Sequence, residues 1–593
     1  MKVRKTSWRR QTEITISTLT MTLLGVAFFF WVSEISVAQN SATASVISGS
    51  VTTDRGVVRA FRVRAADTVH KITYTVFTNK GRYQIFNLPA SRYDIQVIEE
   101  GYDSPVEHVE VKAGESKTAN LELKAKVAAD GAAFNAAEAA RGDDANAASP
   151  QQGGPVELVD YDELYPPDPA RDLLVKNCFG CHGPAGWHSR GGKTEAGWRQ
   201  AVTNMMTWQG VKRAVAPPWV TPDKFTPEEK ESIVKYFAKN FPSNHKRRNW
   251  RLDTLVRDED ALAQAIYIRY ELPPPRGPDF SNTGQPRRNP GEQAFPSLVR
   301  PGLIWLADAG ASSVLALDIH NPDYATRMKE YKIPHPANLN VTPHGNIEVG
   351  DKVYWTEYGP IEDNVGELDL KTGEIHRYSA PSTCCAGSHT LRADSRRNIW
   401  YTMIYGQSKI GRLDAVTKKI TEFEPIRGAN WYGITVDKQD RVWAAGVGTP
   451  NIVMYDQKTD KWTKYPTTNS NRRIALDSKG NVWTSQYFGN SVAMVDPNTG
   501  KVTEYKLPLK YGAVYEVRPD ADDNIWAENA IYNSLVRFDR RTNKWTYFPY
   551  PMEWQHTPKM ELDSEGTIWF GLSGQATAFK SKGNVPAKGS ATH

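Results

Sequence analysis

The stretch Asp477-Ser478-Lys479-Gly480-Asn481-Val482-Trp483 decides the fold, because it returns in closely similar form as Asp563-Ser564-Glu565-Gly566-Thr567-Ile568-Trp569. An apolar or aromatic residue followed by Trp marks the same point of the pattern seven times, with spacings of 50, 45, 43, 40, 43 and 43 residues. The seven marks are Trp305, Trp355, Trp400, Trp443, Trp483, Trp526 and Trp569. A period of this length with several short strands per unit is the signature of a β-propeller.

Each repeat continues into a strand that ends in Asp, as in Val495-Asp496, then a turn and an outer strand such as Lys501–Tyr505. The last repeat has no outer strand after Trp569, but residues 265–273 carry the outer-strand pattern before the first repeat. We expect this strand to complete the seventh blade and close the ring, which removes exposed sheet edges. The sequence therefore predicts a seven-bladed β-propeller over residues 265–580. The repeated Trp residues are interpreted as packing between blades rather than as a substrate-binding set.

Three stretches of one repeat, Asn398–Thr402, Lys409–Asp414 and Lys419–Phe423, resemble the virginiamycin B lyase (streptogramin lyase) propeller family. The resemblance extends over about residues 265–580. It implies a propeller that opens a cyclic depsipeptide by elimination, assisted by Mg, with His and Glu residues on one face.

The residues that carry the lyase activity are not reproduced here. The family's His-Gly-Ile before an inner strand is Tyr432-Gly433-Ile434, and its Trp-Phe-Thr-Glu pattern survives only as Trp355-Thr356-Glu357. Glu-x-His occurs as Glu374-Ile375-His376, but on an expected outer strand, far from the channel. Lyase activity therefore remains an alternative hypothesis.

A candidate binding site follows from the strand order of a propeller. The innermost strand of each blade begins, and the second strand ends, at the same face, so residues at these points converge on one channel mouth. The candidates before inner strands are His389, Tyr432, Arg472, Arg473, Tyr515 and His556, and those after the Trp strands are Glu357, Met403, Gln486 and Glu528. Propeller ligands bind at such polar mouths. We expect a small molecule, a polymer or a protein partner there.

The segment Cys178-Phe179-Gly180-Cys181-His182 is the C-x-x-C-H haem attachment sequence. Two thiols one helical turn apart can reach the two vinyl groups of one porphyrin, and the adjacent His points its imidazole at the iron. A thioredoxin-like redox pair would need a βαβ context, which the surrounding sequence lacks. We therefore expect one covalent haem c, attached through Cys178 and Cys181 and ligated by His182.

The sixth iron ligand is expected from the same region, where Met205 and Met206 are the only methionines between residues 158 and 250. Trp198, Val202 and Met205 fall on one helix face, and Met206 is turned about 100° away. The stretch resembles small cytochrome c domains in which a Trp precedes the axial Met by two turns. Met205 is the preferred ligand, with Met206 or His188 as alternatives; a thioether ligand raises the haem potential.

A closing helix that starts after Thr226 completes the helical region. With the lead-in helix before Cys178 and the helix that carries Met205, it makes a minimal class I cytochrome c fold. This domain is predicted over residues 158–250.

The N-terminus reads as an export signal. A basic stretch over residues 2–10 precedes an apolar run over residues 14–32, and Ser36-Val37-Ala38 resembles a cleavage site. The prediction is a signal peptide over residues 1–38, with an uncleaved membrane anchor as the alternative. Either reading places the rest of the chain in the periplasm or outside the cell.

Residues 44–124 alternate apolar and polar positions between turns, as strands do. Thr78–Tyr83, Phe86–Pro89 and Gly101-Tyr102 resemble the carboxypeptidase regulatory-like family, which implies a small transthyretin-like β-sandwich that serves as a spacer or adhesion module. Residues 125–157, rich in Ala, Gly, Asp and Asn, are predicted to be a flexible linker, and residues 581–593 a disordered tail.

The adjacent Cys384 and Cys385 precede His389 in the same loop. Three hypotheses stay open for them: a vicinal disulfide, a metal site with His389, or ordinary thiols.

Together these features predict a mainly β, multidomain chain that works as an exported mono-haem cytochrome c for electron transfer with a redox partner protein. Its propeller would bind a substrate or partner, and the whole would be an oxidoreductase if it is an enzyme. A non-catalytic binding or adhesion protein with a redox-relay haem is one alternative, and the lyase is another. The formal net charge, 73 basic against 67 acidic residues, is only +6, and no basic block beyond the N-terminus indicates a nucleic-acid partner.

Overall fold

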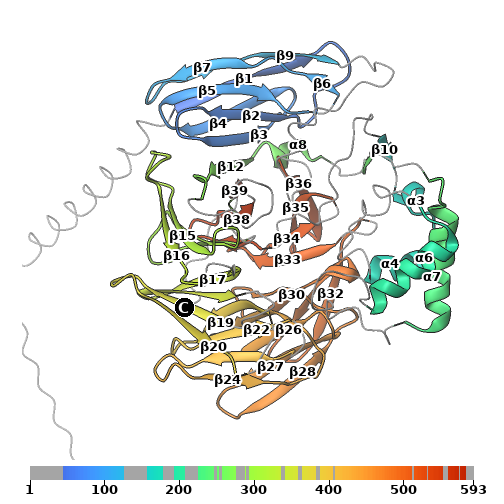
Figure 1. Ribbon diagram of the computed structural model, residues 1–593. Helices are drawn as coiled ribbons and strands as arrows, with labels where there is room; N and C mark the ends of the chain where they lie inside the picture. Colours follow the sequence, from blue (N-terminus) through green and yellow to red (C-terminus); the bar gives the residue numbers. More distant parts are fainter. Residues whose placement is uncertain are drawn as a thin grey trace, which may run out of the picture.

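The computed structural model describes residues 45–99, 101–125, 157–159, 161–177, 192–207, 225–245, 250–252, 257–275, 288, 293–335, 341–357, 364–381, 387–404, 408–509, 513–529, 532–551, 559–572 and 575–581. The chain is mainly β and multidomain, as predicted, with few helices (Figure 1). No helix within these ranges is long and apolar enough to cross a membrane.

The repeats form antiparallel four-stranded sheets, here called blades 1 to 6, whose strands pair in chain order. Blade 1 consists of β13 (Ala294–Pro296), β14 (Leu303–Asp308), β15 (Ser313–Asp318) and β16 (Met328–Lys332). Blade 2 consists of β17 (Pro343–Val349), β18 (Lys352–Glu357), β19 (Asn364–Asp369) and β20 (Ile375–Ser379). Blade 3 consists of β21 (Ser388–Ala393), β22 (Ile399–Met403), β23 (Ile410–Leu413) and β24 (Ile420–Phe423). Blade 4 consists of β25 (Trp431–Val436), β26 (Val442–Gly446), β27 (Asn451–Asp456) and β28 (Lys461–Pro466). Blade 5 consists of β29 (Ile474–Leu476), β30 (Val482–Gln486), β31 (Ser491–Val495) and β32 (Val502–Lys506). Blade 6 consists of β33 (Val514–Pro519), β34 (Ile525–Asn529), β35 (Ser534–Asp539) and β36 (Lys544–Pro549). Each marker Trp of the sequence pattern lies on the second strand of its sheet and is at most 1% exposed.

Blade 7 joins the two ends of the repeat region. It consists of β37 (Glu561–Leu562), β38 (Ile568–Leu572), β39 (Gln575–Ser581) and β12 (Ala265–Glu271). β12 pairs antiparallel with β39 over seven residues, from Ala265 opposite Ser581 to Glu271 opposite Gln575. The predicted outer strand is therefore confirmed, and β13 of blade 1 contacts β37 and β38 on the other side of the joint.

The repeated stretch Asp477–Trp483 forms a tight turn that is hydrogen-bonded to its own Trp. In blade 5, Asp477 Oδ1 accepts hydrogen bonds from the backbone N–H groups of Lys479 and Asn481, and its Oδ2 accepts one from Trp483 Nε1 at 3.0 Å. Gly480 adopts φ +82°, a left-handed conformation that glycine adopts without strain. The same Asp-to-Trp bond, at 2.8–3.1 Å, recurs six residues apart in blades 3, 4, 6 and 7. Each of these bonds satisfies a buried indole N–H, which fixes the Trp between two sheets.

The N-terminal strands form a β-sandwich. One of its sheets has the order β4 (Arg82–Leu88), β1 (Ser45–Thr53), β9 (Leu121–Ala125) and β6 (Tyr102–Asp103), with β8 (Ser116–Thr118) paired to β1. The other contains β3 (Ile72–Phe77), β2 (Arg62–Asp67), β5 (Ser91–Val97) and β7 (Glu107–Val111) in that order. This second sheet does not end at β3, because β3 pairs antiparallel with β12 of blade 7, from Ile72 opposite Tyr270 to Val76 opposite Ile266.

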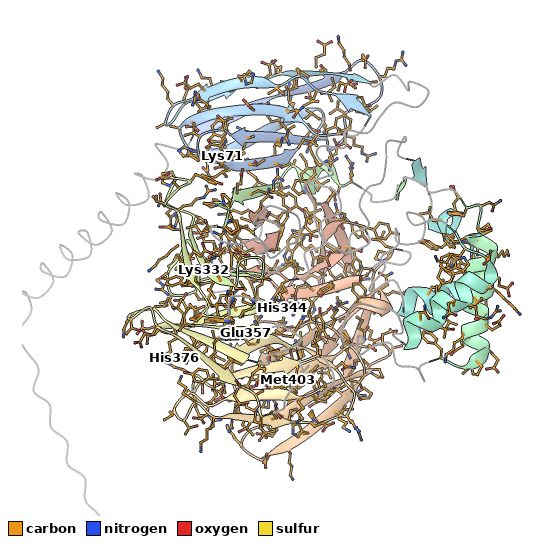
Figure 2. The ribbon with its side chains drawn as sticks, viewed as in Figure 1. Lys71, Lys332, His344, Glu357, His376 and Met403 are labelled. Atoms are coloured by element: carbon orange, nitrogen blue, oxygen red, sulfur yellow. The ribbon has the colours of Figure 1, made fainter. Side chains whose placement is uncertain are left out.

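The sandwich and blade 7 thus share one continuous eight-stranded sheet, which the sequence did not lead us to expect (Figure 1). Arg327 of blade 1 reinforces the joint, here called the seam. Its guanidinium donates to the carbonyl of His70 at 2.7 Å and to those of Lys71 and Glu271, and the residue is 1% exposed. Lys71 marks the seam in Figure 2.

A helical region lies beside the ring. It contains α3 (Tyr161–Leu164), α4 (Pro169–Asn177), α6 (Glu195–Thr207) and α7 (Pro227–Asn240), and its flanks meet where β10 (Glu157–Val159) pairs with β11 (Trp250–Leu252). α7 contacts both α4 and α6. Trp198 of α6 stacks on Phe237 of α7 with ring centroids 4.7 Å apart, and Leu174 of α4 is buried in the same apolar cluster. Thr226 caps α7, as predicted.

Candidate functional site

One register position places a side chain from each of five successive blades at the start of the innermost strands. Counted eleven residues back from the marker Trp, this position holds His344, His389, Tyr432, Arg472 and Tyr515 in blades 2 to 6. All but His344 were predicted from the sequence. We call these five, together with Arg473, Tyr487 and Lys559, the mouth cluster. In Figure 2, His344 lies toward the interior of the ring, whereas His376 lies at its outer edge.

Contacts between blades that are not neighbours show that the cluster spans the central channel. The hydroxyl of Tyr432 in blade 4 hydrogen-bonds that of Tyr515 in blade 6. Arg473 Nη1 in blade 5 donates to Thr390 Oγ1 in blade 3 at 2.5 Å. Lys559 of blade 7 lies 2.8 Å from Nδ1 of His344 in blade 2. Each pair reaches past one intervening blade, which is possible only where the inner strands converge on the channel.

Arg472 occupies the middle of a tyrosine cage. The centre of its guanidinium lies 4.6 Å from the ring centroid of Tyr432, 4.7 Å from that of Tyr487 and 3.8 Å from that of Tyr515. One Nη donates to Tyr432 Oη at 3.1 Å. Tyr487 comes from η1 (Tyr487–Gly489), the short 3₁₀ turn that follows β30. Three blades therefore contribute to one cation–π site.

The two histidines of the mouth cluster lie side by side. Their ring centroids are 4.2 Å apart, and the His389 ring lies 4.0 Å from that of Tyr432. Burial lowers the pKa of both imidazoles well below the ordinary value, and the nearby Lys559 and Arg473 lower it further. Both rings are therefore neutral at pH 7, and a neutral imidazole offers one N–H donor and one acceptor nitrogen.

A charged layer lies deeper in the channel. Glu561 of blade 7 accepts hydrogen bonds from Arg392 of blade 3 at 2.5 Å and from Arg518 of blade 6 at 3.0 Å. Burial would raise the pKa of Glu561, but these two guanidinium groups hold it at about 2. Glu516 lies 2.9 Å from Arg518 and 3.5 Å from Arg473. Its pKa is raised, because burial outweighs those two cations.

The candidates that follow the Trp strands do not join this cluster. Glu357 forms an ion pair at 2.6 Å with Arg377 on the outer strand of its own blade, and Gln486 donates to Glu504 on the outer strand of blade 5 at 2.9 Å. Met403 is packed in an apolar cluster, and Glu528 is fully buried on β34. Glu357 and Gln486 therefore interact with the outer strand of their own blade and not with residues across the channel.

Other candidates lie outside the described residues: Cys178, Cys181, His182, His188, Cys384, Cys385 and His556. Met205 and Met206 lie in α6, at the positions where the helical prediction put them, but their side chains are also outside that description. Within the described part of the chain, no group of three or more His, Cys, Asp or Glu side chains could hold a metal ion.

Sequence reasoning missed His344, Tyr487 and Lys559. His344 could have been found, because it stands at the same distance before Trp355 as His389 does before Trp400. Lys559 is one position off that register, next to Pro558, and Tyr487 comes from a turn rather than from an inner strand. Only the three-dimensional arrangement brings these two into the cluster.

The helical region meets the ring beside this site. α4, whose last residue Asn177 directly precedes Cys178, contacts η1, which carries Tyr487. The sequence alone gives no reason for this contact, because the two segments are separated by about 310 residues. It brings the helix that leads into the C-x-x-C-H motif next to the mouth cluster.

Fold and site together define a β-propeller with a polar, cross-linked channel mouth, attached to a β-sandwich. Residues 326–587 match the model of the virginiamycin B lyase family, and residues 46–124 match that of the carboxypeptidase regulatory-like domain. No curated protein matches the chain.

Three solved structures illustrate the likeness of the propeller. A streptogramin B lyase structure is 20% identical, with a TM-score of 0.45, and the match covers 53% of this chain and 98% of the other. Virginiamycin B lyase from Staphylococcus aureus is 18% identical, with a TM-score of 0.45 and coverage of 53% and 99%. YCF48 from Cyanidioschyzon merolae is 14% identical, with a TM-score of 0.39 and coverage of 49% and 97%.

Proposed function

We propose that this chain is an exported mono-haem cytochrome c whose propeller binds a substrate or redox partner at the channel mouth. The contact between α4 and η1 carries the proposal. α4 ends at Asn177, directly before the C-x-x-C-H motif, and η1 contributes Tyr487 to the mouth cluster. A haem held by Cys178 and Cys181 would follow α4 directly in the chain, and α4 contacts the element that carries Tyr487, so such a haem could exchange electrons with a molecule bound at the mouth.

The available donors fit haem c. Cys178 and Cys181 would hold the porphyrin covalently, His182 would ligate the iron, and Met205, with Met206 as the alternative, would be the sixth ligand. When bound, the haem supplies one-electron transfer. The contacts of α7 with α4 and α6, around Trp198 and Phe237, hold together the helices that flank the motif.

The mouth cluster would bind its ligand through its own side chains. Its aromatic rings and cations are fixed by contacts across the channel, so a ligand meets a preorganised surface. Because His344 and His389 are neutral at pH 7, they add no charge to the mouth and can hydrogen-bond a bound molecule.

A second candidate function is a lyase that acts at the same mouth. The match of residues 326–587 to the virginiamycin B lyase family favours it, as does the pair of neutral histidines, either of which could act as a base. Against it, Glu357 is neutralised by Arg377, and Glu374 and His376 lie at the outer strand. Magnesium-dependent opening of a cyclic depsipeptide, abolished in His389→Ala, would support the lyase.

The central proposal is tested on the full-length chain, expressed with export and with the cytochrome c maturation machinery. We expect a thioether-type pyridine haemochrome with one haem per chain, and its loss in Cys181→Ala. Met205→Ala should lose the long-wavelength Met–iron band, whereas Met206→Ala keeps it.

Recovery of an exported, folded chain with unmodified thiols at Cys178 and Cys181 would refute the cytochrome assignment. Cys384→Ala serves as the control cysteine variant, because it lies outside the C-x-x-C-H motif and should keep the haem.

A further inference from the structure

The described part of the channel carries more positive than negative charge. Its cations are Arg392, Arg472, Arg473, Arg518 and Lys559, and its carboxylates are Glu516 and Glu561. Glu561 is bonded to Arg392 and Arg518, and Glu516 lies against Arg518 and, at 3.5 Å, Arg473. Glu561 is thus shared by two cations of the deeper layer, and Glu516 by Arg518 of that layer and Arg473 of the mouth cluster. No carboxylate within the described residues pairs with Arg472.

Among these cations, the buried side chain of Arg472 has few hydrogen-bond partners. It is 8% exposed, it makes one hydrogen bond, to Tyr432 Oη, and its Nε has no partner. A buried guanidinium without a counter-charge is strongly unfavourable, and the three tyrosine rings around it offset only part of that cost. An arrangement of this kind is complete only when an acceptor with negative charge joins it.

Arg473 points to the same conclusion independently. It is 2% exposed; Nη1 donates to Thr390 and Nε lies 3.5 Å from Glu516 Oε2, but Nη2 has no partner. Its guanidinium lies 4.7 Å from the Tyr432 ring, on which Arg472 also packs. The guanidinium groups of Arg472 and Arg473 thus pack on the same Tyr432 ring, and each has an N–H group that makes no hydrogen bond. The paired N–H groups of a guanidinium match the two oxygens of a carboxylate or phosphate.

We propose that the channel mouth is an oxyanion site, in which Arg472 and Arg473 bind the carboxylate or phosphate group of a small molecule. The tyrosine rings around Arg472 exclude water from the charged group, which strengthens its attraction to the cations. This inference deepens the proposed function, on which it rests for its biological role, because it names the class of ligand that lies beside α4.

The test uses the full chain and four probes at matched ionic strength: inorganic phosphate, benzoate, the neutral isostere benzamide, and chloride. Thermal unfolding and calorimetric titration are measured for each, because a ligand that binds only the folded state raises the unfolding temperature. We expect phosphate, benzoate or both to raise it above the benzamide and chloride references. Arg472→Gln should weaken anion binding at least 10-fold, the effect of losing one charge-assisted bond pair.

Arg412→Gln is the matched control, because Arg412 also lies over an aromatic ring, 5.7 Å from Trp400, but belongs to β23 of blade 3 and not to the mouth cluster. It should bind anions as the wild type does. If Arg472→Gln does not fold, Arg472→Lys replaces it; this variant keeps the charge without the fork and should bind at least 5-fold more weakly.

Stabilisation by phosphate alone assigns the site to phosphate esters, by benzoate alone to carboxylates, and by both to the shared oxyanion. No anion effect beyond benzamide and chloride, or equal anion binding by the wild type and the Arg472 variant, overturns the inference. Haem content is read from the same samples. Anion binding without a haemochrome would refute the proposed cytochrome alone, and a haemochrome without anion binding would refute the oxyanion site alone.

Discussion

Glu561 links the stability of the ring to pH through one carboxylate. Its pKa of about 2 lies below the ordinary 4.5, since Arg392 and Arg518 outweigh the effect of burial. A lowered carboxyl pKa contributes stability that is fully present above about pH 4.5 and is lost as the pH falls through 2. The size of the shift corresponds to about 3 kcal/mol.

We therefore expect Glu561→Gln to unfold about 3 kcal/mol more easily than the wild type at pH 7, and the two proteins to converge toward pH 2. Urea unfolding at a series of pH values measures this difference. Glu565→Gln is the control, because that side chain forms only an exposed pair with Lys580 and should leave the curve unchanged. A constant difference between Glu561→Gln and the wild type from pH 7 to pH 2 would contradict the assignment.

Asp477 makes a second prediction at this scale. Its carboxylate accepts hydrogen bonds from two backbone N–H groups, from the Asn481 side chain, from Arg540 Nη1 and from the buried indole of Trp483, so Asp477→Ala leaves that indole N–H unsatisfied. We expect a loss of about 2 kcal/mol in the free energy of unfolding. Chemical denaturation followed by Trp fluorescence measures it.

Asp496→Ala offers the comparison for Asp477. Asp496 also binds a backbone N–H in a turn, at Asn498, but its turn lies on the outside of the blade and contacts no Trp. Its loss should cost less than about 1 kcal/mol. Equal effects of the two substitutions would mean that the indole bond contributes nothing.

Part of the site could be read from single residues, and part could not. His389, Tyr432, Arg472 and Tyr515 were predicted because the Trp repeat fixes the register of every inner strand. Glu357 and Gln486 were placed at the same mouth, but they pair with Arg377 and Glu504 instead. The choice between inward and outward pairing depends on which partner lies opposite, and no repeat pattern encodes that.

At the scale of elements, one pairing of β12 could be predicted from the sequence and the other could not. Its pattern revealed the pairing with β39, because outer strands of all blades share one alternation. The pairing with β3 left no trace in sequence, since a strand edge is recognised through backbone N–H and C=O groups that every residue carries. The side chains of the seam, such as Arg327, become meaningful only once that pairing is known.

η1 is the element through which the ring holds α4, and Gly489 is its sensitive point. A Cβ at Gly489 would lie 2.6 Å from Asn469 Nδ2 and 2.9 Å from Ser491 Oγ, so a larger residue must displace η1 or its neighbours. We expect Gly489→Val to increase hydrogen exchange of the α4 amides, residues 169–177, about 10-fold. Exchange mass spectrometry of the peptides that cover α4 measures the change.

Gly373→Ala is the control for η1: its φ of +79° makes alanine locally strained, but a Cβ there meets no atom within 4 Å and the turn lies in blade 2, away from η1. It should leave α4 exchange unchanged. Unaltered α4 protection in Gly489→Val would show that η1 does not hold the helix.

At the scale of the whole molecule, the sandwich covers the outer edge of blade 7. Deletion of residues 45–125 exposes β12 with its unpaired backbone groups, and such an edge pairs with other chains. We expect the truncated protein to form dimers or larger species at micromolar concentration, where the full chain does not pair through this edge. Size-exclusion chromatography with light scattering distinguishes the two.

A charge on the exposed edge should reverse that association. Ile268 lies on β12 opposite Tyr74 of β3, and Ile268→Lys in the truncated chain should restore the monomer. Association that persists through this substitution would place the contact elsewhere.

The shared sheet also sets an order of assembly. Protein chains emerge N-terminus first, so β3 and β12 are both available while roughly 300 residues that separate β12 from β39 are still being made. A lone outer strand has no blade to join during that interval, but the finished sandwich already offers it an edge. We therefore expect the sandwich to act as a template that keeps the first strand of the ring in register until the last one arrives, so that the ring closes onto a strand already in place.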